Sequence, residues 1–501
     1  MRLVSTVQYI ALPLAASLAA GAAHAAAERL LADNIVPVVV RGDNPSLRNA
    51  PLVDVTVCNQ RGKCKTVPNV IVDTGSTGLV LFRGAVEELK LGPIALDDSP
   101  GYPYSHWWQS RSKNLWGQLH WAKVGLGKVM TTQAIPVLVF DLPKRGEPLP
   151  RGYSKVDSRH ATSMRSNGIL GIGPQRVIEN RYRFYDHGRF LDLEPDELRG
   201  KQLVNPIAHF PAPYNNGSVI SMPEVDRSKG AERVRGWLGL GIGKATDRLF
   251  PSAVRVVSHE LDANAQFSAM LGTRQVNVSM QSGLNALLLD LTHLGVPMHP
   301  TARDLHDARV PMPIELGVPS GGGFEPLSRP LYVGPTLDYL EAHRGFGALP
   351  MLSGWRGEPG ATNVLGLPFY YGRTVATGLS GTVNPFARGA VATAADVDDE
   401  ESFEIIDDDE PLRIGSASGP VILDDYLDRD ARRDPASVAK GAVAAHKPLR
   451  IGSASGPVIL DDYLDRNARR DPASVAKGAV ATDEDFDLMS ESPNGYVAYT
   501  D

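Results

Sequence analysis

Residues 70–81 read Val-Ile-Val-Asp-Thr-Gly-Ser-Thr-Gly-Leu-Val-Leu, and this stretch decides the fold. Three apolar residues lead into Asp73 and a second apolar run follows the turn, so a buried strand is expected to deliver one carboxylate to a tight loop. In that loop we expect Thr74 to pin the backbone with its hydroxyl, Gly75 to allow close backbone approach, and Ser76 to hydrogen-bond the ionised carboxylate. The alternative is an ordinary turn, in which Asp and Gly serve geometry alone.

The composition is that of a globular protein with many turns. Of its 501 residues, 43% are hydrophobic and 22% are charged, which is enough apolar material for a large core. The 49 glycines and 38 prolines favour short strands and turns over long helices. Short apolar runs separated by turn residues continue over residues 34–386, which predicts a mainly β structure. A net charge of −6 gives no reason to expect a nucleic-acid partner.

The N-terminus has the pattern of a secretory signal peptide. Arg2 precedes an apolar run from Tyr9 to Ala20, and cleavage after Ala25 fits a small-x-small site. A membrane anchor is the competing interpretation, but the apolar run is short for a bilayer span. We therefore expect residues 1–25 to be removed, leaving an exported, periplasmic or extracellular protein with no membrane attachment.

The two cysteines, Cys58 and Cys64, lie in one short segment flanked by β-type residues, with Arg-Gly between them. This pattern predicts a hairpin, and in an oxidising compartment a structural disulfide across its loop. Two cysteines cannot make a structural zinc site, and no other motif implies a metal or a cofactor.

If the carboxylate of Asp73 serves in peptide hydrolysis, that chemistry needs a second carboxylate beside it. Two carboxylates about 3 Å apart share one proton, so one acts as base toward a water and the other donates to the scissile carbonyl oxygen. The best candidate is Asp290, which follows an apolar, strand-like run within residues 285–296. Its loop departs from the first, because Leu291 lacks the hydroxyl of Thr74 and a threonine, Thr292, stands in place of the glycine. We expect Thr292 to supply a supporting hydroxyl from that next position.

Further motifs carry a family resemblance. An apolar-apolar-Gly segment follows each candidate loop, as Ile169-Leu170-Gly171 and as Val364-Leu365-Gly366. Other supporting pieces are Val-Thr-Val-Cys before the first loop, Leu115-Trp-Gly-Gln-Leu-His-Trp-Ala-Lys-Val, Asn215-Asn-Gly-Ser-Val-Ile-Ser-Met-Pro and Gly366-Leu-Pro-Phe-Tyr-Tyr-Gly-Arg-Thr-Val. Together these motifs, over residues 50–380, resemble the bacterial exported domain-of-unknown-function family 3443, which is related to pepsin-like aspartic proteases. The resemblance implies a bilobal pepsin-like fold with a cleft between the lobes.

The same resemblance suggests how the chain is divided. It implies an N-terminal lobe over residues 34–215 and a C-terminal lobe over residues 216–386. A pepsin-like flap would follow the first loop, and the candidate aromatic residues are Tyr102, Tyr104, Trp107 and Trp116. The alternative is that these aromatic side chains simply pack on the lobe.

From residue 387 to residue 501 we expect a low-complexity tail that is partly disordered. An acidic run at 396–410 should stay solvated, and two near-identical units with a period of 37 residues follow it, at 411–447 and 448–481. Two copies are fewer than a solenoid usually needs. A duplicated linker, a docking arm for an unknown partner and a processed pro-segment all remain open.

Two functions follow from these observations. The first is an aspartic-type endopeptidase, with Asp73 as the ionised base and Asp290 carrying the shared proton, which binds an extended peptide or protein substrate by adding a strand against the flap. The alternative is a catalytically impaired peptide- or protein-binding protein that keeps the pepsin-like cleft.

Overall fold

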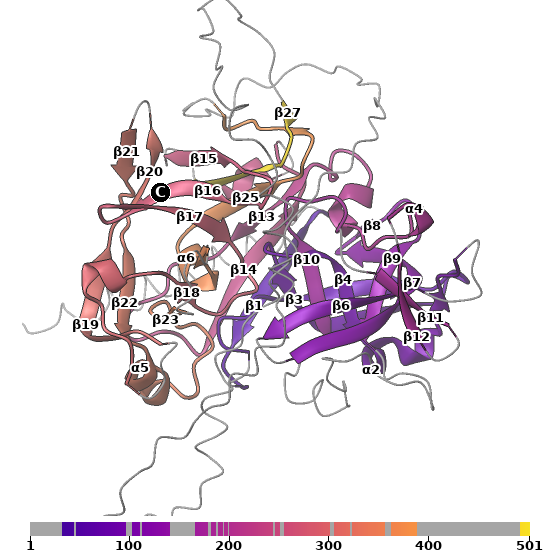
Figure 1. Ribbon diagram of the computed structural model, residues 1–501, viewed down its shortest axis with the longest axis horizontal. Helices are drawn as coiled ribbons and strands as arrows, with labels where there is room; N and C mark the ends of the chain where they lie inside the picture. The colour runs from indigo at the N-terminus through magenta and orange to yellow at the C-terminus, as the bar shows by residue number, and fades with distance from the viewer. Residues whose placement is uncertain are drawn as a thin grey trace, which may run out of the picture. The chain divides into compact units, whose positions relative to one another are not determined.

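The computed structural model describes residues 33–387 and 491–501, apart from 45–46, 97–102, 111–112, 141–165, 179–181, 187–188, 194, 199, 244–245, 251–254, 301–304, 321–322 and 356–361. Strands dominate these residues, which confirms the mainly β prediction (Figure 1). The helical elements are short: α2 (Arg83–Val86), η2 (Glu87–Leu89), α4 (Pro195–Leu198), η3 (Pro206–His209), η4 (Asp247–Leu249), η5 (Thr292–Leu294), α5 (Thr336–Ala342) and α6 (Leu367–Tyr370). None of the helices in this described part is long and apolar enough to cross a membrane. The predicted signal peptide and both repeats lie outside the described residues.

The N-terminal lobe consists of strands β2 to β12. Their bounds are β2 (Leu52–Cys58), β3 (Cys64–Asp73), β4 (Thr77–Phe82), β5 (Gly92–Pro93), β6 (Pro103–Ser110), β7 (Lys113–Leu126), β8 (Val129–Met130), β9 (Ile135–Phe140), β10 (Gly168–Ile172), β11 (Tyr182–Asp186) and β12 (Arg189–Leu193). In β2 the apolar residues alternate with Asp54 and Thr56, as in a strand with one buried face. By contrast, every residue of β4 and β9 is buried, because these strands lie inside the lobe.

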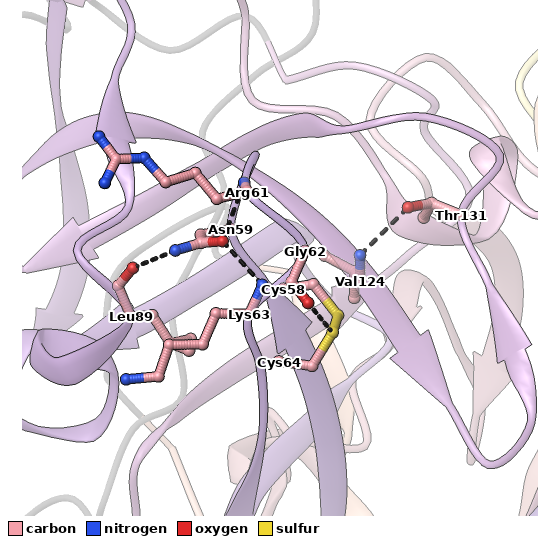
Figure 2. Close-up of a disulfide and its surroundings, with 9 residues drawn as sticks. All are labelled: Cys58, Asn59, Arg61, Gly62, Lys63, Cys64, Leu89, Val124 and Thr131. Atoms are coloured by element: carbon pink, nitrogen blue, oxygen red, sulfur yellow. Dashed lines mark hydrogen bonds between the residues drawn. A yellow bond between two sulfur atoms is a disulfide. The ribbon is translucent and has the colours of Figure 1, made fainter.

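The disulfide closes the β2–β3 hairpin as predicted. Cys58 pairs with Cys64 in the strand register, and their sulfur atoms are bonded (Figure 2). The side chain of Asn59 organises the turn, because its Oδ1 accepts hydrogen bonds from the backbone N–H groups of Arg61 and Lys63, both at 3.0 Å. Gly62 adopts a φ of 80°, which residues with a side chain rarely adopt.

A central antiparallel sheet connects the two lobes. Its strands pair in the order β1 (Ile35–Arg41), β14 (Arg233–Leu240), β13 (Gly217–Ser221), β25 (Thr374–Gly378), β28 (Tyr496–Thr500) and β15 (Val256–Glu260). The first strand of the described residues, β1, therefore pairs with β14, and one pair of residues, Val39 with Leu52, joins β1 to β2.

The end of the chain belongs to this sheet, and the tail prediction for residues 387–501 is wrong there. Strand β28 lies between β25 and β15, and all five of its residues are buried. Just before it, β27 (Glu491–Ser492) pairs with β26 (Thr382–Val383). Tyr-Val-Ala-Tyr-Thr after an Asn-Gly turn has strong β propensity and enough apolar surface to add a strand to the core. The chain therefore leaves the described fold after β26 and re-enters it at β27, and these two strands pair with each other.

The C-terminal lobe contains two smaller sheets. The larger is formed by β21 (Gly323–Pro326), β20 (Leu316–Ser320), β16 (Phe267–Leu271), β17 (Arg274–Met280), β24 (Asn363–Leu365), β18 (Leu287–Leu288) and β23 (Ser353–Gly354), in that order. The smaller pairs β19 (Asp307–Ile314) with β22 (Leu331–Pro335).

Both lobes contain the same arrangement of four strands. In the N-terminal lobe, β10 pairs parallel with β3 and antiparallel with β4, while β4 pairs parallel with β9. In the C-terminal lobe, β24 pairs parallel with β17 and antiparallel with β18, while β18 pairs parallel with β23. In each case a later strand is inserted between the strands before and after a loop. This repeated topology is the bilobal pepsin-like fold that the sequence predicts.

Candidate functional site

Asp73 is the last residue of β3, and only 1% of its surface is exposed. Its Oδ1 accepts a hydrogen bond of 2.9 Å from the backbone N–H of Gly75, and its Oδ2 accepts one of 2.6 Å from the hydroxyl of Ser76. The following strand begins at Thr77 and is fully buried. The local sequence therefore holds one carboxylate in a turn between two buried strands, with donors supplied by the turn itself.

The loop that faces Asp73 lies between β17 and β18 and begins Gln281-Ser282-Gly283. The backbone N–H of Thr74 donates to the hydroxyl of Ser282 at 3.1 Å, and the N–H of Ser282 donates to the hydroxyl of Thr74 at 3.0 Å. Each hydroxyl then donates to a carbonyl of the opposite lobe, Thr74 to Met280 and Ser282 to Val72. All of these groups are buried, so the two loops are joined by four reciprocal hydrogen bonds.

This reciprocity fixes which residues are equivalent in the two lobes. Thr74 and Ser282 are separated by 208 residues, so Gln281, the residue before Ser282, is the equivalent of Asp73, the residue before Thr74. The strand register gives the same result. Gly171, which follows Ile169-Leu170 in β10, lies opposite Asp73. Leu365 of β24 lies opposite Met280, so the next residues in the same register are Gly366 and Gln281. Glutamine therefore occupies the position of the second carboxylate.

Two glycines bring these loops into contact. The backbone N–H of Gly283 donates to Oδ1 of Asp73 at 3.2 Å, and a Cβ at Gly283 would lie 2.7 Å from Cβ and Cγ of Asp73. In the same way, a Cβ at Gly75 would lie 2.3 Å from Cγ of Gln281. Gln281 is 8% exposed, and its Nε2 donates to the hydroxyl of Ser279 at 3.2 Å. Each lobe thus packs a glycine of its loop against a side chain of the other lobe, Gly283 against Asp73 and Gly75 against Gln281.

Electrostatically, the site contains one buried acid and one neutral amide. Burial raises the pKa of Asp73, and this effect outweighs the hydrogen bonds from Ser76, Gly75 and Gly283, which act to lower it. With Gln281 opposite, the rise in the pKa of Asp73 comes from desolvation, whereas a pair of carboxylates would add mutual repulsion.

The structure does not bring Asp290 to Asp73, so the interpretation of Asp290 as the second catalytic carboxylate is corrected. Asp290 follows β18, the strand that leaves the second loop, whereas Asp73 ends the strand that enters the first. Its Oδ2 accepts a 2.8 Å bond from Nη1 of Arg274, an ion pair on the surface. Partial burial acts to raise the pKa of Asp290, but bonds from Thr292 and Arg274 lower it overall. Thr292 donates to Asp290 through its hydroxyl and its N–H, so it caps this local turn.

The candidate flap forms a hairpin, made by β6 and β7. Tyr104 and Trp107 lie on β6, where they pair with Gln118 and Leu115, and Trp116 lies on β7. Tyr102 lies outside the described residues. On its other edge, β6 pairs with β11 at residues 103–105. Part of the edge that we expected a peptide to use is therefore occupied by a strand of this chain.

The sequence reasoning missed the second half of the site. Its signal was a pair of small residues, Ser282-Gly283, after the alternating strand Val276–Met280, which parallels Thr74-Gly75 after β3. Tyr370 was also missed, and its hydroxyl lies 2.9 Å from that of Thr74. In the described part of the chain, no three His, Cys, Asp or Glu side chains are grouped to hold a metal ion.

Among solved structures, the crystal structure of an aspartic proteinase from Irpex lacteus is similar, with a TM-score of 0.39 and 15% identity, over 68% of this chain and 93% of that chain. No curated protein matches the chain. A family model described as "Protein of unknown function (DUF3443)" matches residues 31–393. The chain therefore belongs to the DUF3443 family.

Proposed function

We propose that this protein binds extended peptide segments with a pepsin-like site and does not hydrolyse them. The observation that carries the proposal is the position of Gln281, which stands where a second carboxylate would be needed. The alternative of an active endopeptidase loses its proposed second acid, because Asp290 is paired with Arg274 on the surface.

The chemistry of peptide hydrolysis explains why this substitution matters. One carboxylate must accept a proton from water, while the other, protonated, donates to the carbonyl oxygen. When the tetrahedral intermediate collapses, the first gives its proton to the leaving amine, and the second takes a proton back from a hydroxyl of the intermediate. The amide of Gln281 can donate a hydrogen bond to a carbonyl, but unlike a carboxyl group it cannot transfer a proton to it. Asp73 alone can activate water, yet nothing described beside it completes the proton transfers.

Other features support a role in binding. The four hydrogen bonds between the Thr74 and Ser282 loops are retained, so the centre of the site is held rigidly although one acid is missing. A carboxyl group and an amide at such a centre can hydrogen-bond the N–H and C=O groups of an extended peptide. Among the described residues, β6 beyond residue 105 has no strand partner on its outer edge, which leaves a segment of backbone to which a peptide can add.

The test uses fluorescently labelled, denatured casein with the full chain, over pH 3 to 7. Binding is followed by anisotropy, and new peptide ends are sought by mass spectrometry. The wild-type protein is expected to bind casein and to produce no new ends at any pH.

Two variants, one at the surface and one at the centre of the site, are compared with the wild type in this assay. Asp290→Asn alters the ion pair with Arg274 and the local turn at Thr292, away from Asp73, and should leave binding unchanged. Gln281→Leu removes the amide at the centre of the site and should weaken binding. Cleavage by the wild type that Asp73→Asn abolishes would overturn the proposal, as would an absence of casein binding.

A further inference from the structure

Three arginine side chains line a small cavity that does not include Asp73. The cavity has a volume of about 40 Å³ and is lined by Arg227, Arg329 and Arg373, together with Glu224 and the aromatic rings of Tyr332 and Tyr371. Among the described residues that line the cavity, Glu224 is the one acidic residue, against three arginines. The lining therefore carries an excess of positive charge.

Arg373 lies deepest in this cluster. It is 6% exposed, and its guanidinium carbon lies 4.5 Å from the centre of the Phe369 ring. Nη1 donates to the carbonyl of Phe369 at 3.0 Å and Nη2 to the carbonyl of Arg329 at 2.8 Å, but the buried Nε has no partner among the described residues. Burial lowers the pKa of Arg373 to about 10. A buried cation with one unused donor is costly unless an anion completes its environment.

One nearby carboxylate, that of Asp501, is already engaged by other groups. The carboxylate of Asp501 acts favourably on Arg373, but its Oδ1 and Oδ2 accept hydrogen bonds from the backbone N–H of Ser328, at 3.0 and 2.9 Å. It also accepts from the N–H of Arg329. Asp501 therefore moderates the charge of the cluster without filling the cavity.

The other two arginines are exposed and held in place by their neighbours. Nη1 of Arg329 donates to the carbonyl of Gly372 at 2.9 Å, and the guanidinium of Arg227 lies 4.0 Å from the centre of the Tyr332 ring. The positive charges of Arg329 and Arg227 both act to lower the pKa of Arg373, because like charges repel. Because the two side chains are ordered by these contacts, little conformational entropy is lost when a ligand binds between them.

We propose that this cavity binds a small oxyanion, a phosphate or carboxylate group, through Arg227, Arg329 and Arg373. Guanidinium groups present planar, paired N–H donors that match the oxygens of such groups. A buried water needs about 10–15 Å³ of such space, so the cavity has room for an anionic group of a few atoms. The bound charge would relieve the repulsion among the three cations and give Nε of Arg373 an acceptor.

The test titrates the full-chain protein with inorganic phosphate, and separately with acetate, at constant ionic strength set by sodium chloride. Binding is measured by calorimetry and by the rise in Tm. Saturable binding of either anion is expected, and the tighter of the two identifies the group that the site prefers.

Substitutions of the exposed arginines localise the binding without disturbing the core. Arg227→Gln and Arg329→Gln should each weaken binding at least about tenfold. Arg255→Gln is the matched control, because Arg255 is an exposed arginine outside the cavity, paired with Glu325 at 2.7 Å. It should change the affinity less than twofold. No saturable binding beyond that of chloride, or equal weakening in all three variants, would overturn the proposal.

Discussion

Removing the hydroxyl of Ser282 should strongly destabilise the fold, because that hydroxyl joins the two lobes at the centre of the site. Ser282 is fully buried, and its Oγ accepts from the N–H of Thr74 at 3.1 Å and donates to the carbonyl of Val72 at 2.9 Å. Ser282→Ala removes both bonds and leaves the N–H of Thr74 in a buried position without an acceptor.

The expected size follows from these two losses. A net hydrogen bond contributes about 1 kcal/mol, and a buried donor left without a partner costs about 1–3 kcal/mol. The free energy of unfolding should therefore fall by about 2–4 kcal/mol, a large part of the about 5–15 kcal/mol by which folded proteins are stable. A small cavity replaces the oxygen atom, and its effect is included in this range.

Urea denaturation, followed by tryptophan fluorescence and by circular dichroism, measures the change. Ser228→Ala is the control, since Ser228 is exposed and its hydroxyl donates to Asp226 within the same turn. It should alter the free energy of unfolding by no more than about 0.5 kcal/mol. If Ser282→Ala is as stable as this control, the reciprocal contact does not hold the lobes together and our account of the site is refuted.

Four further outcomes are expected. Gly283→Ala should destabilise the protein by about 1–3 kcal/mol in urea titrations, because its Cβ would lie 2.7 Å from Asp73; wild-type stability would contradict the contact. Because the pKa of Asp73 is raised, its contribution to stability is present below the unfolded pKa and is lost as the pH rises through the folded pKa. The stability of Asp73→Asn relative to wild type should therefore increase as the pH rises above about 4, and a pH-independent difference in calorimetry would refute this. Replacing Cys58 and Cys64 by alanine reopens a loop of sequence separation 6 and should cost about 2 kcal/mol by the loop-entropy relation; no change in urea titrations would contradict it. A protease site engineered into residues 391–489 should, when cut, leave β28 bound in size-exclusion chromatography until denaturant is added; its release from the native protein would show that β28 is not held by its neighbours.

Much of the fold could be predicted from local patterns. The apolar runs on both sides of Asp73 specify two buried strands and the turn between them, because every part of that signal lies within twelve residues. The Cys58–Cys64 hairpin was also predictable, since its strands, turn glycine and disulfide are adjacent in the sequence. In both cases local propensity and final structure agree.

The second half of the site could not be found in the same way. A search for a partner to Asp73 looks for an acid, and the acid with the best apolar flank was Asp290. The feature that identifies the partner loop is the pairing of Ser282 with Thr74 across 208 residues, a contact that no local pattern encodes. Once the strand pairs of the two lobes are aligned by their register, Gln281 is identified as the equivalent of Asp73 from its position alone. Functional sites are where such departures from a pattern are expected.

The C-terminal strand was overlooked for a similar reason. The acidic run and the two repeats dominate the composition after residue 387, and a short strand at 496–500 does not change that average. Its place in the fold depends on β25 and β15, which are distant in sequence and present a gap that a strand with Tyr496 and Tyr499 fills. The family match to residues 31–393 also ends before it.

The most direct measurement is the proton titration of the Asp73 carboxyl group. The full chain would be labelled with ¹³C at aspartate carboxyl carbons, and the signal assigned by its loss in Asp73→Asn. The account predicts a single titration step displaced above the ordinary aspartate pKa, and two coupled steps only when Gln281→Asp adds a second carboxylate. Two coupled steps in the wild-type protein would contradict it, because they would require another acid beside Asp73.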